Sequence, residues 1–261
     1  MILLNSNYLL WNYEFDMNFI RKILYKLLII LFVLITQNSG VYAQQSILNI
    51  PSVDVLPPYK TNLKSTFRFN GERPEFFNAT PVVTQNIGYK TDVYFGVSVG
   101  QQRDIFFGNF DSDIDGLAGF KKGFDITSTT QGAIGSLISP SLQTKESPVN
   151  FSYVLLAQKI PATNTRITGG VYARSDNDQF FPDLTGALVG FEQAVIKDRL
   201  NILVDWTSGN RPFGILATGI GYTFKSGTTV KLGTLIPNGS NARFAYIISI
   251  SKTFSALKKS K

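Results

Sequence analysis

The stretch "RFAYIISISKTF", residues 243–254, decides the fold class of this chain. One face carries its aromatic and most of its branched side chains, Phe244, Tyr246, Ile248, Ile250 and Phe254. The residues between them are mostly small or polar. A repeat of two residues is typical of a β-strand, in which successive side chains point to opposite faces. The stretch therefore predicts a strand with one apolar face and one small, polar face.

The same alternation returns along most of the chain. It predicts firm strands at 149–158, 166–174, 186–196, 199–207, 215–224, 228–236 and 243–254, and further strands at 62–69, 82–89 and 92–101. Two weaker candidates are 104–110 and 124–135. The count is ten without this weak pair and twelve with it. We favour twelve, because ten strands would leave one long loop from about 102 to 148.

The faces and connections of these segments favour a membrane barrel. A tilted strand needs about 9–11 residues to cross a bilayer, which is the length seen here. The second face carries glycine, alanine, serine and threonine with occasional charges, as suits a lumen. Short turns at 225–227, 196–199 and 159–165 interleave with longer links at 236–242, 208–214 and 175–186. This asymmetry of loop length is typical of transmembrane barrels.

The N-terminal region predicts export. After Met17 come Arg21, Lys22 and Lys26, then an apolar run over 27–35 and the small-residue ending Val41-Tyr42-Ala43. This order is that of a secretory signal peptide, and the apolar run is too short to span a bilayer. We predict that residues 1–43 are a cleaved signal peptide and that Met17 is the true start.

With this leader, the alternating strands and the absence of cysteine, the chain resembles a bacterial outer-membrane β-barrel of the porin-like kind. The resemblance implies an all-β fold, an antiparallel transmembrane β-barrel over 62–254. A periplasmic lead-in at 44–61 would precede it, and a basic tail at 255–261 would follow. It also implies contact with outer-membrane lipid and insertion by the barrel assembly machinery. That machinery commonly reads a terminal aromatic residue, here Phe254, although seven residues follow it.

Composition narrows the possible functions. The chain has no histidine and no cysteine, which excludes Ser-His or Cys-His catalysis and metal sites built on those residues. Outer-membrane barrel enzymes depend on histidine, so we expect no enzymatic activity. Lysine and arginine are scattered, so we expect no nucleic-acid partner. No cofactor is expected apart from the calcium candidate described below.

The alternation assigns a set of charged residues to the lumen. Candidate lumen-lining and selectivity residues are Arg166, Arg174, Glu192, Asp205 and Lys231, with Lys64 and Arg68 as further members. Such a mixed set can tune solute preference in a water-filled bore, or it can pair across a narrow bore and plug it. We expect the two carboxylates to pair with lumen arginine and lysine.

A calcium candidate lies at Asp111, Asp113 and Asp115, which with Gly116 begin like a calcium-binding loop. A complete loop of that kind ends on a glutamate at its twelfth position, where this chain has Lys122. The alternative is an Asp-Gly turn in a solvated loop. In a twelve-stranded barrel we expect this turn on the periplasmic side.

Three functional hypotheses remain open. The first is a passive porin-like channel for small solutes in the outer membrane. The second is a closed structural or surface-interaction barrel without conductance, with 175–185 and 208–213 as contact loops. The third is a secreted soluble β-sandwich, in which a second sheet covers the apolar face.

Overall fold

The computed structural model describes residues 46–71, 77–100, 113–142, 148–175, 185–209, 214–239 and 243–255. In this part of the chain the regular elements are twelve β-strands. They are β1 (Lys60–Asn70), β2 (Phe77–Asn86), β3 (Thr91–Gly100), β4 (Asp113–Asp125), β5 (Thr130–Ser139), β6 (Val149–Ile160), β7 (Thr165–Ser175), β8 (Thr185–Ile196), β9 (Leu200–Thr207), β10 (Ile215–Thr223), β11 (Thr228–Pro237) and β12 (Ala245–Ser255). None of the described residues belongs to a helix that is long and apolar enough to cross a membrane.

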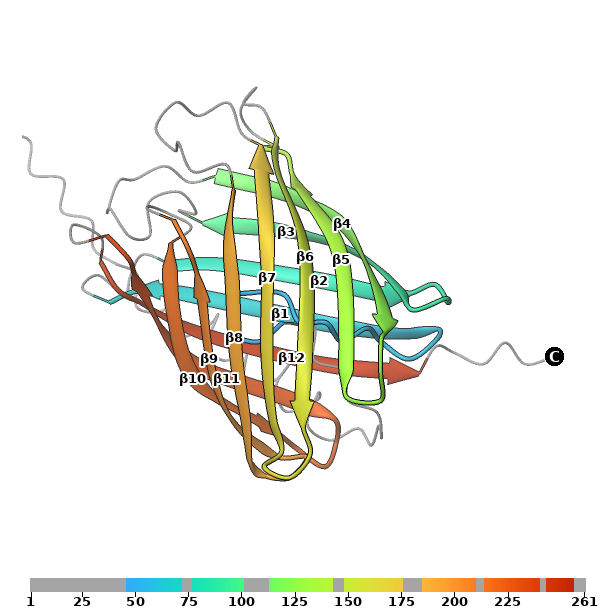
Figure 1. Cartoon of the computed structure of the whole chain (residues 1–261). Helices are drawn as coiled ribbons and strands as arrows, with labels where there is room; N and C mark the ends of the chain where they lie inside the picture. The colour runs from blue at the N-terminus through green and yellow to red at the C-terminus, as the bar shows by residue number, and fades with distance from the viewer. Residues whose placement is uncertain are drawn as a thin grey trace, which may run out of the picture.

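The strands form one closed antiparallel barrel (Figure 1). Each strand pairs with its neighbours in sequence, and β1 pairs with β12 from Lys60↔Ser255 to Asn70↔Ala245. Closure gives both edge strands a partner, so that no edge of the sheet is left with open main-chain groups. The predicted fold class and the favoured count of twelve are confirmed. A two-sheet sandwich is not formed.

The outer surface is apolar, as the alternation predicts. Large aliphatic and aromatic side chains point outward from every strand, for example Phe95, Val154, Leu156, Ile167, Val171, Val189, Phe191, Ile202, Ile220, Leu232 and Tyr246. Their neighbours in sequence point inward; many of these are small, polar or charged, and a smaller set that includes Leu155, Leu188 and Leu203 is apolar. An exterior of this kind matches the hydrocarbon of a bilayer.

The two ends of the barrel differ in the length of their connections. Short turns at 87–90, 126–129, 161–164, 197–199 and 224–227 lie at the end where β1 begins and β12 finishes. We call this the short-turn end. Asn164 and Gly227 lie in these turns with positive φ angles of 52° and 81°, as tight hairpins require. The connections at the opposite end are longer, and include 101–112 and 176–184.

Two strand predictions in the first half of the barrel need correction. The predicted strand at 124–135 is wrong, because it spans the end of β4, the turn 126–129 and the start of β5. The candidate at 104–110 lies outside the described residues. The predicted turn around the aspartates is also wrong for Asp113 and Asp115, which belong to β4. Their backbone pairs with β3, from Gly100↔Asp113 to Thr91↔Lys122, and this ladder overrides the local turn preference.

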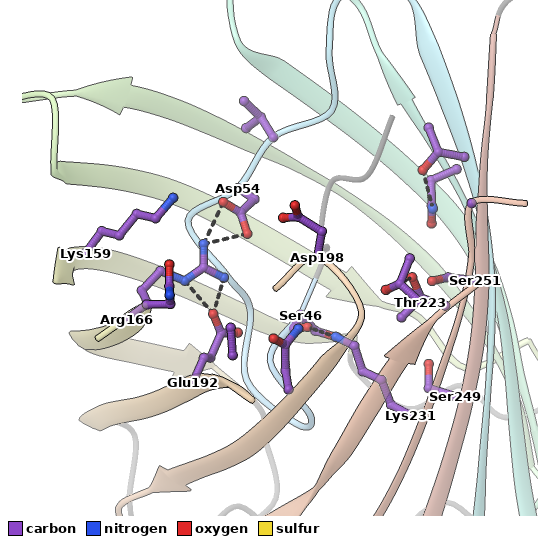
Figure 2. Close-up of a pocket in the computed structure, with 18 of the residues that line it drawn as sticks. Ser46, Asp54, Lys159, Arg166, Glu192, Asp198, Thr223, Lys231, Ser249 and Ser251 are labelled. Atoms are coloured by element: carbon purple, nitrogen blue, oxygen red, sulfur yellow. Dashed lines mark hydrogen bonds and ion pairs between the residues drawn. The ribbon is translucent and has the colours of Figure 1, made fainter. Parts of the chain in front are cut away.

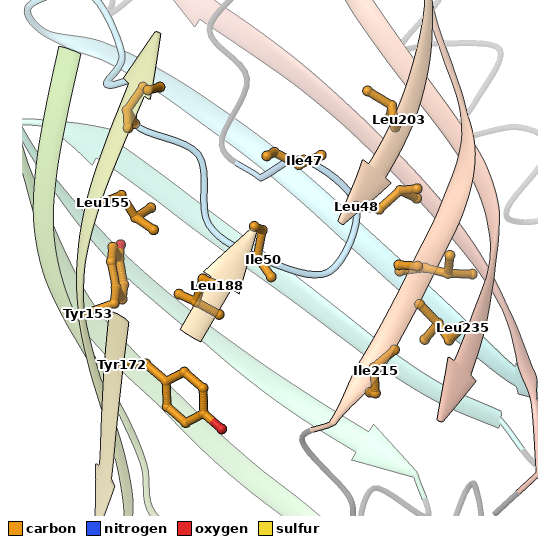
Figure 3. Close-up of a cluster of buried hydrophobic side chains, with 14 of the residues drawn as sticks. Ile47, Leu48, Ile50, Tyr153, Leu155, Tyr172, Leu188, Leu203, Ile215 and Leu235 are labelled. Carbon is orange, nitrogen blue, oxygen red and sulfur yellow. The ribbon is translucent and has the colours of Figure 1, made fainter. Parts of the chain in front are cut away.

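The interior is filled partly by the chain's own N-terminal region. Residues 46–56, which we call the lumen segment, precede β1 and lie inside the barrel (Figure 3). Their aliphatic side chains are almost fully buried: Ile47, Leu48, Ile50, Val53 and Leu56. They pack among inward side chains of the wall that include Leu155, Leu188, Leu203 and Leu235. Part of the sequence assigned to a periplasmic lead-in thus lies within the lumen.

A charged substitution on the outer face tests whether lipid surrounds the barrel. Val171 lies in the middle of β7 and is 61% exposed. We expect Val171→Arg to lower the free energy of unfolding from lipid vesicles by about 2–4 kcal/mol, as for arginine near the bilayer midplane. The measurement is denaturant unfolding in vesicles, with Val171→Leu as the apolar control. Equal stability of the two variants would contradict a lipid-facing exterior.

Candidate functional site: the barrel lumen

The chain enters the lumen through a turn just before β1. Lys60 N donates a hydrogen bond to Pro57 O at 3.1 Å, and Tyr59 has a positive φ of 59°. Asp92, at the start of β3, accepts hydrogen bonds from Leu56 N at 3.1 and 3.2 Å. The lumen segment therefore enters at the short-turn end.

Deeper in the barrel the lumen segment reverses direction. Ile47 N donates to Ile50 O at 3.0 Å, and Ser46 and Pro51 form an isolated antiparallel bridge. The tip of the segment is thus a tight turn whose main-chain groups must find partners in the wall.

Asp205 and Lys231 supply partners on the two sides of this turn. One carboxylate oxygen of Asp205, on β9, accepts hydrogen bonds from Leu48 N at 2.7 Å and Asn49 N at 2.9 Å. Lys231 Nζ, on β11, donates to the carbonyl oxygens of Ser46 and Ile47, the latter at 2.7 Å. An anion thus faces amide N–H groups and a cation faces carbonyl groups, so both interactions are charge-assisted.

Further cations of the wall contact the same segment. Lys64 Nζ donates to Ser46 Oγ at 2.8 Å. Arg68 lies 3.5 Å from Asn49 Oδ1, and Lys121 Nζ lies 3.4 Å from Ser52 O. These residues belong to β1 and β4, so the charged groups hold the segment from several sides of the barrel.

An ion-paired triad lies nearer the short-turn end (Figure 2). Arg166 Nη1, on β7, donates to both carboxylate oxygens of Asp54 at 2.7 Å, and the same guanidinium pairs with Glu192 on β8. The three side chains are only 18%, 23% and 10% exposed, respectively. Such pairing is what makes ionised groups tolerable at this depth. The triad fixes the base of the lumen segment to the wall.

A cavity of about 430 Å³ opens beside this triad at the short-turn end (Figure 2). Its lining combines the lumen segment with strand ends and turns, including Asn164, Asp198 and Gly227. The charged residues among the described lining are Lys64, Lys159, Arg166, Lys197 and Lys231 on the basic side, and Asp54, Glu192 and Asp198 on the acidic side. Basic groups outnumber acidic ones, so the mouth has a mildly positive potential.

The structure brings together most of the residues that the alternation assigns to the lumen. Arg166, Glu192 and Lys231 line the cavity, and Asp205 is buried deeper against the lumen segment. Arg174 is also buried, toward the opposite end of β7, and is not among the described residues that line the cavity.

One expected partnership is wrong. Glu192 pairs with a lumen arginine as expected, but Asp205 accepts hydrogen bonds from main-chain N–H groups of the lumen segment. The physical reason is that the segment occupies the space across which Asp205 would have reached a cation. This partner was not foreseen, because the sequence analysis left residues 44–61 outside the barrel.

Three functional residues were missed altogether: Asp54, Asp92 and Lys121. Asp92 and Lys121 occupy inward positions of β3 and β4, and Lys121 could have been found from the outward Phe120 and Phe124 on either side of it. Asp54 lies in an irregular segment, where no alternation indicates a face.

The calcium candidate gains no support. Among the described residues there is no group of three or more acidic, histidine or cysteine residues that could hold a metal ion. Asp111 lies outside the described residues. Asp113 and Asp115 belong to the extended backbone of β4 and do not form a loop.

Closure, the apolar exterior and the charged interior define a closed antiparallel β-barrel of twelve strands, which is the kind of fold found in porin structures. Among solved structures, the KdgM porin matches with a TM-score of 0.55 and 6% identity, over 74% of this chain and 99% of that one. The KdgM porin in complex with disordered oligogalacturonate matches with a TM-score of 0.53 and 6% identity, over 75% and 99%. The outer membrane phospholipase A from Escherichia coli matches less well, with a TM-score of 0.47 and 7% identity, over 76% and 97%.

No protein-family model and no curated protein matches the sequence. At identities of 6% the similarity to the KdgM porin is a similarity of fold.

Removal of the Asp205 carboxylate tests its grip on the lumen segment. Asp205→Ala leaves the buried N–H group of Leu48 and the partly buried N–H group of Asn49 without this acceptor. We expect the free energy of unfolding to fall by about 1–3 kcal/mol. The matched control is Asp125→Ala, which removes an exposed carboxylate paired with Lys90 and should cost less than about 1 kcal/mol. Denaturant titration in detergent measures both, and equal losses would contradict the anchoring role.

Proposed function

We propose that the protein is a porin-like channel that lets small polar solutes cross the outer membrane passively, without catalysing a reaction. The observation that carries this proposal is a charged cavity inside a closed barrel with an apolar exterior. An apolar outer face requires lipid, and a polar inner face requires water or polar partners. In this proposal a cleaved signal peptide exports the chain, and the barrel assembly machinery inserts it.

The charge pattern supports a preference for anions. Arg166 is neutralised by Asp54 and Glu192. The hydrogen bonds of Lys64 and Lys231 with described residues go instead to hydroxyl and carbonyl oxygens, which carry no net charge. Lys159 and Lys197 add positive charge at the mouth. Rings of basic side chains favour anions in a pore.

A second candidate is a closed barrel with a structural or surface-interaction role. It is favoured by the lumen segment, which fills the middle of the barrel with buried aliphatic side chains. The contact loops suggested for this role, 175–185 and 208–213, lie mostly outside the described residues, so the argument for it comes from the interior alone.

Single-channel recording separates the two candidates. The purified, folded chain is added to a planar lipid bilayer, and its fold is verified by heat-modifiable migration on a detergent gel. We expect discrete current steps for a channel. A folded preparation that stays silent over the whole voltage range would exclude the channel and leave the closed barrel.

Charge reversal at the mouth tests the preference for anions. Lys159→Glu combined with Lys197→Glu replaces two basic groups of the cavity lining by acidic ones. We expect the reversal potential in a salt gradient to shift toward cation preference, because the lining changes from net basic to net acidic. The control is Lys122→Glu, since Lys122 points outward from β4 near the same end. An unchanged reversal potential would mean that ions do not pass this cavity.

A further inference from the structure

The lumen wall contacts residues 46–56 in the way that a binding site contacts a peptide ligand. We propose that the mid-lumen wall is a binding site for a peptide main chain, that its resident occupant is the lumen segment, and that this segment leaves and re-enters through the short-turn end while the barrel stays closed. Movement of the segment would control the open pore and so the passage of solutes, and this consequence rests on the proposed channel function. The binding and release of the segment do not.

The charges of the lumen wall are complementary to the main-chain groups of the lumen segment. Asp205 faces the N–H groups of Leu48 and Asn49, while Lys231 faces the carbonyl groups of Ser46 and Ile47. The same rule holds toward the entrance, where Asp92 accepts from Leu56 N and Lys121 donates to Ser52 O. Each of these four wall charges is thus matched to the sign of the peptide dipole that it meets. A wall that merely filled space would need no such matching.

The shape of the lumen wall also fits the tip of the lumen segment. In the described structure Ile47 Cδ1 occupies the position that a Cβ atom on Gly190 of β8 would need. Leu48 reaches to 3.0 Å from the equivalent position on Gly233 of β11. Glycine at these two wall positions leaves shallow pockets into which the tip of the segment fits. The pocket residues belong to the barrel, and the side chains that fill them belong to the segment.

The lumen segment is separable from the wall of the barrel. The β1–β12 ladder closes the wall without any strand from the segment. The hydrogen bonds of Leu48, Asn49, Ser46 and Ile47 with the wall end on the side chains of Asp205 and Lys231, and the main-chain bond of the tip from Ile47 N to Ile50 O is internal to the segment. Release therefore breaks no rung of the barrel.

The lumen wall can be solvated by water once the segment is released. Asp205, Lys231, Lys121 and Asp92 are groups that water solvates well, so an emptied lumen can fill with water. The burial of the aliphatic side chains favours the bound state, whereas the conformational freedom of the released chain opposes it. Because these contributions oppose each other, the bound state is one side of an equilibrium.

A single thiol placed on the tip reports release directly. The chain has no cysteine, and Ile47 is completely buried, so Ile47→Cys gives one reactive group that is covered only while the segment is bound. We expect a polar maleimide to label this thiol slowly in the folded barrel, whose integrity heat-modifiable migration verifies. Leu48→Cys, at 3% exposure, provides a second reporter if the first variant folds poorly.

Weakening the anchor should accelerate labelling. In the Ile47→Cys background, Asp205→Ala should raise the labelling rate by roughly tenfold or more, since a pair of charge-assisted hydrogen bonds is lost. The control Asp125→Ala removes a carboxylate that pairs with Lys90 at the surface, and it should leave the rate unchanged.

A disulfide should stop release. Ile47→Cys with Gly190→Cys brings two Cβ atoms within the range of a disulfide, because the Ile47 side chain already lies at the Gly190 Cβ position. Oxidation should abolish current if the protein conducts. A reducing agent should restore it. Ile47→Cys alone, which has no partner thiol, is the matched control, and its current should respond to neither treatment.

The outcomes separate the two proposals. If the tip thiols stay unlabelled until the denaturant concentration that unfolds the barrel, with or without Asp205→Ala, the segment is permanent core and the inference fails. If labelling responds to Asp205→Ala but no variant conducts, release stands and the channel fails. If current flows equally in the oxidised and reduced double-cysteine variant, the segment does not control the pore.

Discussion

The pairing of β1 with β12 is the constraint on which the rest of the structure depends. Inside a bilayer there is no water to satisfy main-chain N–H and C=O groups, so a sheet can cross only if its two edges meet. An even number of strands brings Lys60 and Ser255 to the same end, where the register Lys60↔Ser255 begins. Every other strand is then held antiparallel between two neighbours. The alternation of side chains follows, with lipid outside and the lumen inside.

Closure also leaves space inside the barrel that must be filled. Twelve strands enclose more space than their own inward side chains fill, and many of these are small, such as Ala217, Gly221 and Gly233. The lumen segment fills the middle of this space, and its main chain brings polar groups into it. The wall supplies charged side chains as partners, because a buried amide or carbonyl group needs a hydrogen bond and a charge of suitable sign makes that bond stronger. The lumen charges are therefore arranged around a peptide.

The sequence was most informative where one face is lipid and the other is lumen. From β6 to β12 the alternation is clear, and the predicted bounds agree with the structure to within about two residues, as usual for strand ends. It was least informative in β4 and β5, where glycine, alanine and serine occupy many positions and give little contrast between faces. There the count of twelve was right, but the candidate at 124–135 covers the turn between β4 and β5 and parts of both strands.

The lumen segment could not be placed from its sequence. Irregular backbone has no period, so Ile47, Leu48 and Ile50 carry no indication of which surface they face. Proline at positions 51, 57 and 58 correctly argues against a strand, yet it is equally compatible with a solvated linker. The partners of Asp205 and Lys231 were missed for the same reason. Their inward direction follows from alternation, whereas what they meet depends on a segment whose location is set by tertiary contacts alone.

Two lumen lysines belong both to the cavity of the proposed channel and to the proposed binding site of the lumen segment. Lys64 and Lys231 line the cavity at the mouth, and both also bind Ser46 at the end of the lumen segment. An ammonium group that donates to a neutral carbonyl or hydroxyl oxygen gains more from an anion, provided that the anion reaches it. A small anionic solute entering the cavity would therefore compete with Ser46 for the same donors. By mass action, any ligand that binds these lysines only when the segment has moved away favours the released state. The proposed solute preference of the mouth and the proposed release of the segment thus depend on the same two side chains.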